Sequence, residues 1–141
     1  MSIEKQQFTH EIGGKTLTLE VSSFAGQANA AILARYGETV VLATAVMGKE
    51  ESKMDYLPLR VDYEERFYAA GKILGSRFIR REGRPSEDAI LTGRLIDRTL
   101  RPLFNQNIRR EIQVVVTVLS YDGENGTDFV GLVAASTALA V

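Results

Sequence analysis

Hydrophobic and polar residues alternate over much of the first half of the chain, a pattern typical of half-buried strands. In residues 15–21, "KTLTLEV", the apolar side chains of Leu17, Leu19 and Val21 share one face. The pair Gly13-Gly14 before this segment predicts a hairpin turn back to a first strand at "FTHEI".

The next segment, "ANAAILARYGETVVLATAVM", predicts a second hairpin. Its β-branched second half favours a strand, and Gly37-Glu38 supplies a tight turn. Its alanine-rich first half is compatible with either a strand or a helix. "YLPLRVDYEE" then predicts a further strand, with Pro58 at a sheet edge or at the strand entry. One face of this strand carries Leu57, Leu59, Val61 and Tyr63.

The period changes to that of a helix after the arginine-rich stretch. Ser86 stands where an N-cap belongs, and Glu87 and Asp88 favour the positive end of a helix. The apolar residues then recur at spacings of seven, four and three: Ala89, Ile96, Leu100 and Leu103. We therefore predict a helix from about Ser86 to Leu100, ended by Pro102.

A strand and a second helix complete the pattern. "EIQVVVTVLS" is apolar on both faces and rich in β-branched residues, which predicts a buried central strand. "DGENGTD" turns the chain into a helix that begins near Thr127 or Asp128. The order of strands, helix, strand and helix predicts one domain of α+β or mixed α/β class. Because the final "LVAASTALAV" carries no C-cap glycine, we expect residues 1–141 to be cut within this helix.

Composition narrows the classes of function. The 141 residues are 45% hydrophobic and 25% charged, as in an ordinary globular domain. The absence of cysteine excludes disulfides, thiolate nucleophiles and Cys-based zinc sites. The start "MSIEKQQFTHE" is too charged for a signal peptide, and no apolar run reaches the ~18 residues of a membrane span. We expect a cytoplasmic protein with no membrane role.

Charge is distributed unevenly along the chain. Nine arginines and four acids lie between Arg77 and Arg110, a net charge of +5, whereas the remainder carries −6. A basic segment on an acidic body fits a phosphate-binding surface, but a segment folded against its own acidic neighbours gives the same count. Both interpretations remain open from charge alone.

Three long motifs, in a fixed order, carry a resemblance to a known family. "YEERFYAAGKI", "RREGRPSE" and "RLIDRTLRPLF", followed by the "VVVTVLS" strand, resemble the first ribonuclease PH-like core domain of bacterial polynucleotide phosphorylase, the polyribonucleotide nucleotidyltransferases. The match spans nearly the whole chain, and such motifs are far more specific than a short glycine pattern. The resemblance implies that residues 1–141 are this core domain, incomplete at the C-terminus, in a longer protomer.

The resemblance also implies an activity. In that family, inorganic phosphate attacks the 3′-terminal phosphodiester of single-stranded RNA and releases a nucleoside diphosphate. The implied cofactor is magnesium, phosphate is the co-substrate, and the implied assembly is a homotrimer of two-core protomers that also meets other RNA-degradation proteins. Arginines, hydroxyl or backbone donors, and metal-holding carboxylates suit this reaction, because both phosphate groups carry negative charge.

The resemblance places the competent site chiefly in the second core, so we expect no catalytic residue and no metal ligand in this chain. Ribonuclease PH-type relatives offer phosphate a glycine, hydroxyl and arginine run, where this chain has "ENGTDFVG". Asp128 stands in place of the cation, and a carboxylate there repels a phosphate dianion. Gly126, Thr127 and Asp128 are therefore expected to turn and cap the helix. The isolated chain is predicted to be inactive, and an RNA-binding or assembly module without turnover is the alternative.

The stretch "SRFIRREGRPSE", residues 76–87, matches a family loop that projects into the channel of the trimer. The resemblance implies that Phe78 stacks on a base while Arg80 and Arg81 hold phosphates of single-stranded RNA. Arg84 and Arg101 match arginines that line the RNA path. This domain is thus expected to guide RNA and to support assembly.

Two further arginines have two open interpretations. Arg94, Arg98 and Arg101 stand at i, i+4 and i+7 of the predicted helix and form one stripe. Asp97 lies three residues from Arg94 and four from Arg101, so it can hold either of them in a structural ion pair. For Arg94 and Arg98, a structural role and an RNA-facing role both remain open.

Three other features receive a structural interpretation. His10 is the single histidine and lacks metal-ligand spacing, which predicts an exposed strand residue. "DGENGTD" resembles the start of a calcium loop, but Thr127 and Val133 occupy its required glycine and closing positions. Glu64 and Glu65 are adjacent in a strand and point to opposite faces, so we expect charge partners of the arginine loop or a trimer contact.

Overall fold

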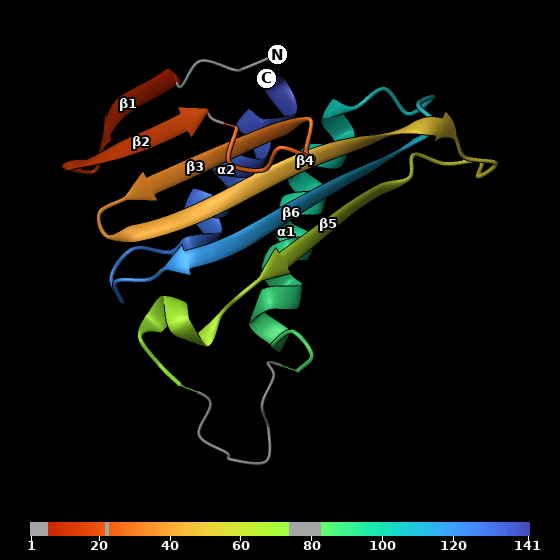
Figure 1. Ribbon diagram of the computed structural model, residues 1–141. Coiled ribbons are helices and arrows are strands. Elements are labelled where there is room, and N and C mark those ends of the chain that lie inside the picture. Colours follow the sequence, from red (N-terminus) through yellow and green to blue (C-terminus); the bar gives the residue numbers. More distant parts are fainter. Residues whose placement is uncertain (1–5, 22, 74–82) are drawn as a thin grey trace.

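The computed structural model describes residues 6–21, 23–73 and 83–141, which form a six-stranded sheet with both α-helices on one of its faces (Figure 1). The strands are β1 (Gln6–Ile12), β2 (Lys15–Val21), β3 (Ala30–Tyr36), β4 (Thr39–Glu51), β5 (Leu59–Glu64) and β6 (Arg110–Ser120). Their order is β1-β2-β3-β4-β6-β5, antiparallel except for the parallel pair of β5 and β6. The predicted mixed α/β class is confirmed.

Both predicted hairpins are present. Gly13 and Gly14 have φ of 58° and 77°, the left-handed region that glycine adopts without strain, and they join β1 to β2. Gly37, with φ of 62°, begins the turn between β3 and β4. The alanine-rich segment is a strand, because its alternate residues Ile32 and Ala34 are fully buried.

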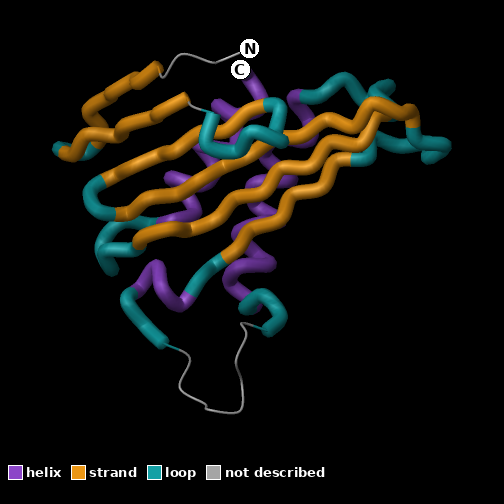
Figure 2. The backbone as a smooth tube through the Cα atoms, in the orientation of Figure 1, coloured by secondary structure: helices purple, strands orange, loops and turns teal. Residues whose placement is uncertain are grey.

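The last strand differs from its prediction in one respect. β6 lies inside the sheet, between β4 and β5, as expected of a central strand. Only one of its faces is buried, however: Val114, Val116 and Val118 lie under the helices, whereas Val115 and Thr117 are half-buried on the open face. The cause is the arrangement of layers, since both α-helices pack on the same face of the sheet (Figure 2).

The first helix, α1 (Glu87–Leu100), agrees with its prediction. The Ser86 Oγ accepts a hydrogen bond from the Ala89 N–H at 3.0 Å, which caps the helix. The buried residues Ala89, Gly93, Ile96 and Leu100 follow at spacings of four, three and four, so one stripe of the helix faces β5. A short 3-10 turn, η2 (Arg101–Leu103), contains Pro102 and ends the element.

The second helix, α2 (Thr127–Ala140), packs on β3, β4 and β6. Small buried residues line its contact with the sheet: Gly131, Ala134, Ala135 and Ala138. These side chains allow the helix backbone to approach the strands closely. The carboxylate of Asp122 fixes the turn before α2 by accepting the backbone N–H groups of Glu124 and Asn125, each at 2.9 Å.

The same Asp122 carboxylate also joins this turn to the β3–β4 hairpin. Its second oxygen accepts the N–H of Glu38 at 3.1 Å and the side-chain amide of Asn125. Thr39, fully buried, donates to the Asn125 carbonyl at 3.2 Å. The segment that resembled a calcium loop therefore uses its first carboxylate to hold backbone N–H groups.

Candidate functional site

The arginine-rich stretch is only partly covered by the structure. Phe78, Arg80 and Arg81 lie outside the described residues, so their predicted contacts with RNA stay predictions. Arg84 is exposed just before α1 and has no ion pair with any described residue. Its guanidinium is therefore available to a ligand on the side of the molecule where α1 begins.

Arg101 lies at the opposite end of α1 and is held by the protein itself. Its Nε and Nη2 atoms donate to both carboxylate oxygens of Asp97, at 3.0 and 2.6 Å. Nη1 and Nη2 also donate to the carbonyl oxygens of Leu57 and Leu59, at 3.2 and 3.0 Å. Four hydrogen bonds thus occupy a group with about five N–H donors. Arg101 fastens the end of α1 to the start of β5.

The two described arginines of the predicted RNA path are not brought together. Arg84 precedes α1 and Arg101 follows it, and a helix of 14 residues is roughly 21 Å long. Asp97 pairs with Arg101. Within the described part of the chain, Arg94 and Arg98 are exposed and form no ion pair, so their role stays open.

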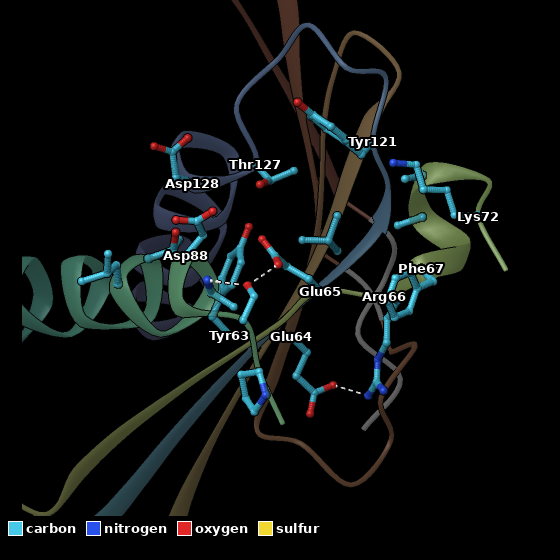
Figure 3. A pocket seen from close by; sticks show the side chains of 18 of the residues that line it. Tyr63, Glu64, Glu65, Arg66, Phe67, Lys72, Asp88, Tyr121, Thr127 and Asp128 are labelled. Atoms are coloured by element: carbon cyan, nitrogen blue, oxygen red, sulfur yellow. Dashed lines mark hydrogen bonds and ion pairs between the residues drawn. The ribbon is translucent and has the colours of Figure 1, made fainter. Parts of the chain in front are cut away.

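A pocket of about 960 Å³ lies beside the start of α1 (Figure 3). Its wall comes from the end of β5, from the 3-10 helix η1 (Phe67–Ala70), and from the first turns of α1 and α2. A hydrogen bond of 2.8 Å from the Tyr121 N–H to the Ala69 carbonyl connects η1 to the end of β6. Gly71, with φ of 66°, ends η1 and directs the chain along the rim.

Tyr63 stands inside this pocket. Its side chain is 5% exposed, and its hydroxyl has no hydrogen-bond partner among the described residues. Burial raises the pKa of Tyr63 to about 12; the nearby Thr127 side chain opposes this shift, and the negative charges of Glu65 and Asp128 add to it. At neutral pH, the pocket therefore contains a neutral phenol that is free to donate one hydrogen bond and to accept others.

One side of the pocket is acidic. Figure 3 shows Asp88 of α1, Asp128 of α2 and Glu65 on the same side as the Tyr63 hydroxyl. Glu65 accepts a hydrogen bond of 2.8 Å from Ser86 Oγ. Asp128 accepts the Phe129 N–H at 2.8 Å, whereas the N-cap residue Gly126 makes no side-chain cap. The expected capping is thus made by Asp128 within the first turn.

The opposite side is basic. Figure 3 places Lys72 and Arg66 across the pocket from the carboxylates. Arg66 Nη2 lies 2.6 Å from Glu64 Oε2, so this arginine is neutralised by its neighbour. Glu64 and Glu65 therefore contact separate partners, Arg66 and Ser86.

No group of three or more His, Cys, Asp or Glu side chains among residues 6–21, 23–73 and 83–141 is arranged to hold a metal ion. His10 is exposed on β1, as predicted. None of the described helices is both long enough and apolar enough to cross a membrane.

Sequence reasoning missed the main feature of the pocket. Tyr63 was predicted only as an apolar core position of a strand, and Asp88 only as a residue that favours the helix start. The available signal was the phenol itself, because a buried tyrosine normally places its hydroxyl against a partner. The presence of Tyr63 and Asp128 in one pocket had no local signal, since 65 positions separate the two residues and only the fold brings them together.

This fold and the motifs around the pocket define a class of RNA-processing domain. Residues 13–141 match the family model for the 3′ exoribonuclease family, domain 1, so the chain belongs to this ribonuclease PH family. Rice (Oryza sativa) Rrp46 has a similar fold, with a TM-score of 0.59 at 13% identity, over 99% of this chain and 56% of that one. The predicted ribonuclease PH-like core is confirmed.

Curated relatives with much higher sequence identity than Rrp46 share the name polyribonucleotide nucleotidyltransferase. The chain is 54% identical over all 141 residues to the polyribonucleotide nucleotidyltransferase of Exiguobacterium sibiricum. It is 56% identical over 138 residues to that of Desulforamulus reducens. The chain spans only 19% and 18% of the lengths of these relatives. The resemblance to the first core domain of this enzyme family is confirmed.

Proposed function

We propose that this chain is the first core domain of a phosphate-dependent 3′-to-5′ exoribonuclease, which releases nucleoside diphosphates from single-stranded RNA. The observation that carries the proposal is the 54% identity over the whole chain to a polyribonucleotide nucleotidyltransferase. Phosphate is then the attacking co-substrate. The enzyme is proposed to be a cytoplasmic homotrimer that meets other RNA-degradation proteins.

Within this enzyme, we assign the domain to guiding RNA and to supporting assembly. Phe78 is proposed to stack on a base, and Arg80 and Arg81 to hold phosphates, because this chain carries the basic loop of its family at these positions. Arg84 extends the same basic surface, and its exposed guanidinium supports this role. Arg101 has one N–H left for RNA after its four internal bonds, so its main role is structural.

The catalytic centre is proposed to lie in a second core, outside these 141 residues. Asp88, Asp128 and Glu65 line the pocket at the start of α2, and this arrangement supports the proposal because carboxylates repel an incoming phosphate dianion. Magnesium would stabilise negative oxygens of the reacting phosphates, and we assign its ligands to that second core.

The test is release of ADP from oligoadenylate in the presence of magnesium and phosphate. We expect the full-length protein to release ADP and the isolated 141-residue chain to release none. Release of AMP without a requirement for phosphate would replace phosphorolysis by hydrolysis. Robust ADP release by the isolated chain would place the catalytic centre in this domain. RNA binding without ADP release by the full-length protein would favour the alternative, an RNA-binding or assembly module.

A further inference from the structure

The Tyr63 hydroxyl is a buried polar group that the proposed function does not use. It is directed into the pocket between η1, α1 and α2 (Figure 3), and no described residue forms a hydrogen bond of normal geometry with it, although the Thr127 side chain lies nearby. An unpaired buried hydroxyl is costly in a folded protein, and such groups occur where a ligand or solvent completes the contact. This hydroxyl therefore indicates that the pocket takes a polar ligand.

The charged side chains beside this hydroxyl indicate whether the ligand is a cation or an anion. Asp88, Asp128 and Glu65 lie on the same side of the pocket as the phenol. The start of a helix often attracts an anion, but here the protein supplies its own acceptors. Ser86 Oγ accepts the Ala89 N–H at the start of α1, and Asp128 Oδ1 accepts the Phe129 N–H at the start of α2. One N–H group at each helix start is thereby satisfied, and the carboxylates add acceptors for a ligand.

The remaining lining limits the ligand to about one positive charge. Arg66 is paired with Glu64 at 2.6 Å, and this pair adds no net charge. Lys72 and Arg84 then oppose the three carboxylates, which leaves the described part of the lining at −1. Apolar side chains of Ala69, Ala89, Leu91 and Val118 complete the wall. This wall suits a short methylene chain behind a single charged group.

We propose that this pocket binds a small primary alkylamine, whose ammonium group lies between the Tyr63 hydroxyl and the carboxylates of Asp88 and Asp128. An ammonium has three N–H donors, and these three side chains supply three acceptors. The phenol oxygen stays neutral at physiological pH and accepts without repulsion. The pocket shares Arg84 of its lining with the proposed RNA path, but its three acceptors, Tyr63, Asp88 and Asp128, are not among the proposed RNA-binding residues.

Calorimetric titration of the RNA-free, full-length protein at constant ionic strength tests the proposal. The probes are putrescine with two charges, N-acetylputrescine with one, 1,4-butanediol with none, and inorganic phosphate. We expect saturable binding of both amines with affinities within about threefold of each other, because the described part of the lining carries a single net charge. We expect no binding of butanediol to this pocket.

Three variants test whether the amine binds in this pocket. Asp88→Asn and Asp128→Asn should each weaken N-acetylputrescine by about fivefold or more, since each removes a charge-assisted hydrogen bond. Tyr63→Phe keeps the ring and should weaken it by about threefold. Asp62→Asn is the matched control: it removes the same charge from β5, where Asp62 pairs with Arg60 outside the pocket, and it should leave the affinity unchanged.

Two results of these titrations would contradict the amine site. An equal loss in Asp62→Asn and Asp88→Asn would mean that bulk charge attracts the amine, and the proposal would be wrong. Phosphate binding that strengthens in Asp128→Asn would make the pocket an anion site and would also overturn it. Neither result affects the release of ADP from oligoadenylate, so failure of the amine site is distinguishable from failure of the proposed function.

Discussion

The ring of Tyr63 lies so close to Gly131 that a Cβ atom at position 131 would come within 3.3 Å of Tyr63 Cε2. The same Cβ would lie 3.1 Å from Val116 Cγ1. On the other helix, a Cβ at Gly93 would lie at an ordinary 3.5 Å from Tyr63 Cβ. Gly131 thus allows α2 to pack closely on the tyrosine ring, whereas the contact of α1 at Gly93 is an ordinary one.

These two glycines should respond oppositely to alanine. Gly131→Ala should lower the free energy of unfolding by about 1–2 kcal/mol, because overpacking against the Tyr63 ring and Val116 outweighs the better helix propensity of alanine. Gly93→Ala meets no close contact and should leave stability unchanged or raise it by up to ~1 kcal/mol. Urea unfolding of both variants measures the difference. Equal effects would mean that α2 does not pack closely on the Tyr63 ring.

Tyr63 should be the last of the five tyrosines in this chain to ionise. Its pKa is raised to about 12, against about 10 for an exposed tyrosine. The folded state therefore keeps a proton that the unfolded state loses, so this contribution to stability is complete below about pH 10 and disappears as the pH rises towards 12. Absorbance titration of phenolate should show a late step that Tyr63→Phe removes. A variant that keeps the late step would assign it to another tyrosine.

The elements of the fold were largely predictable, because they depend on local pattern. The glycine pair 13–14 fixed the first hairpin, and Ser86 with its acidic followers fixed the start of α1. The apolar residues on both faces of β6 predicted that both faces are buried. Hydrophobicity alone, however, does not reveal that both helices cover the same face of the sheet. Val115 is apolar yet only half-buried for this reason.

The site was less predictable than the fold. Asp97 was recognised as a partner of Arg101 from its spacing of four residues. The carbonyl oxygens of Leu57 and Leu59 accept hydrogen bonds from the same guanidinium. Because every residue has a backbone carbonyl, the sequence gives no signal of these two contacts. The pocket around Tyr63 combines residues from five separate elements, β5, η1, α1, β6 and α2, which only the tertiary structure brings together.

Asp122 should make the free energy of unfolding depend on pH in the acidic range. The backbone N–H groups of Asn125 and Glu124 hold the pKa of Asp122 well below its usual value near 4. The stabilisation is therefore complete above about pH 4 and is lost as the pH falls further, when the unfolded state takes up the proton first. Asp122→Asn should be less stable than the unsubstituted protein at pH 7, and this gap should shrink below pH 4.

A neighbouring acid provides the control for this prediction. Glu124 lies in the same turn with its side chain 77% exposed, and it makes a 3.4 Å ion pair with Lys15. Glu124→Gln should be close to neutral at every pH. A gap between Asp122→Asn and the unsubstituted protein that stays constant from pH 7 to pH 3 would contradict the assigned role of the carboxylate.

Arg101 should be required for stability more than for RNA binding. Arg101→Lys keeps the charge but loses the planar fork that reaches Asp97 and two carbonyls, so the free energy of unfolding should fall by about 1–2 kcal/mol. Arg98→Lys, on the exposed face of the same helix, should change it by less than ~0.5 kcal/mol. Chemical unfolding and oligoadenylate binding are measured in parallel. A loss of RNA affinity in Arg101→Lys without a loss of stability would reverse the assignment.

The central claim is that the basic loop guides single-stranded RNA towards a phosphorolytic centre elsewhere in the protein. Replacing Arg80 and Arg81 by glutamate in the full-length protein should weaken phosphorolysis of a long oligoadenylate, because a long strand must pass the loop. A strand of a few nucleotides can reach the catalytic centre without it and should be affected much less. Each lost phosphate contact should also lower the slope of log affinity against log salt by about 0.7.

The most direct measurement is therefore ADP release from a short and a long oligoadenylate by this double variant, with binding of the long strand at several salt concentrations. If the basic loop guides RNA, we expect a selective loss on the long strand together with a reduced salt slope. Equal losses on both lengths with an unchanged slope would contradict it, and the arginines would then be part of a structural network of ion pairs.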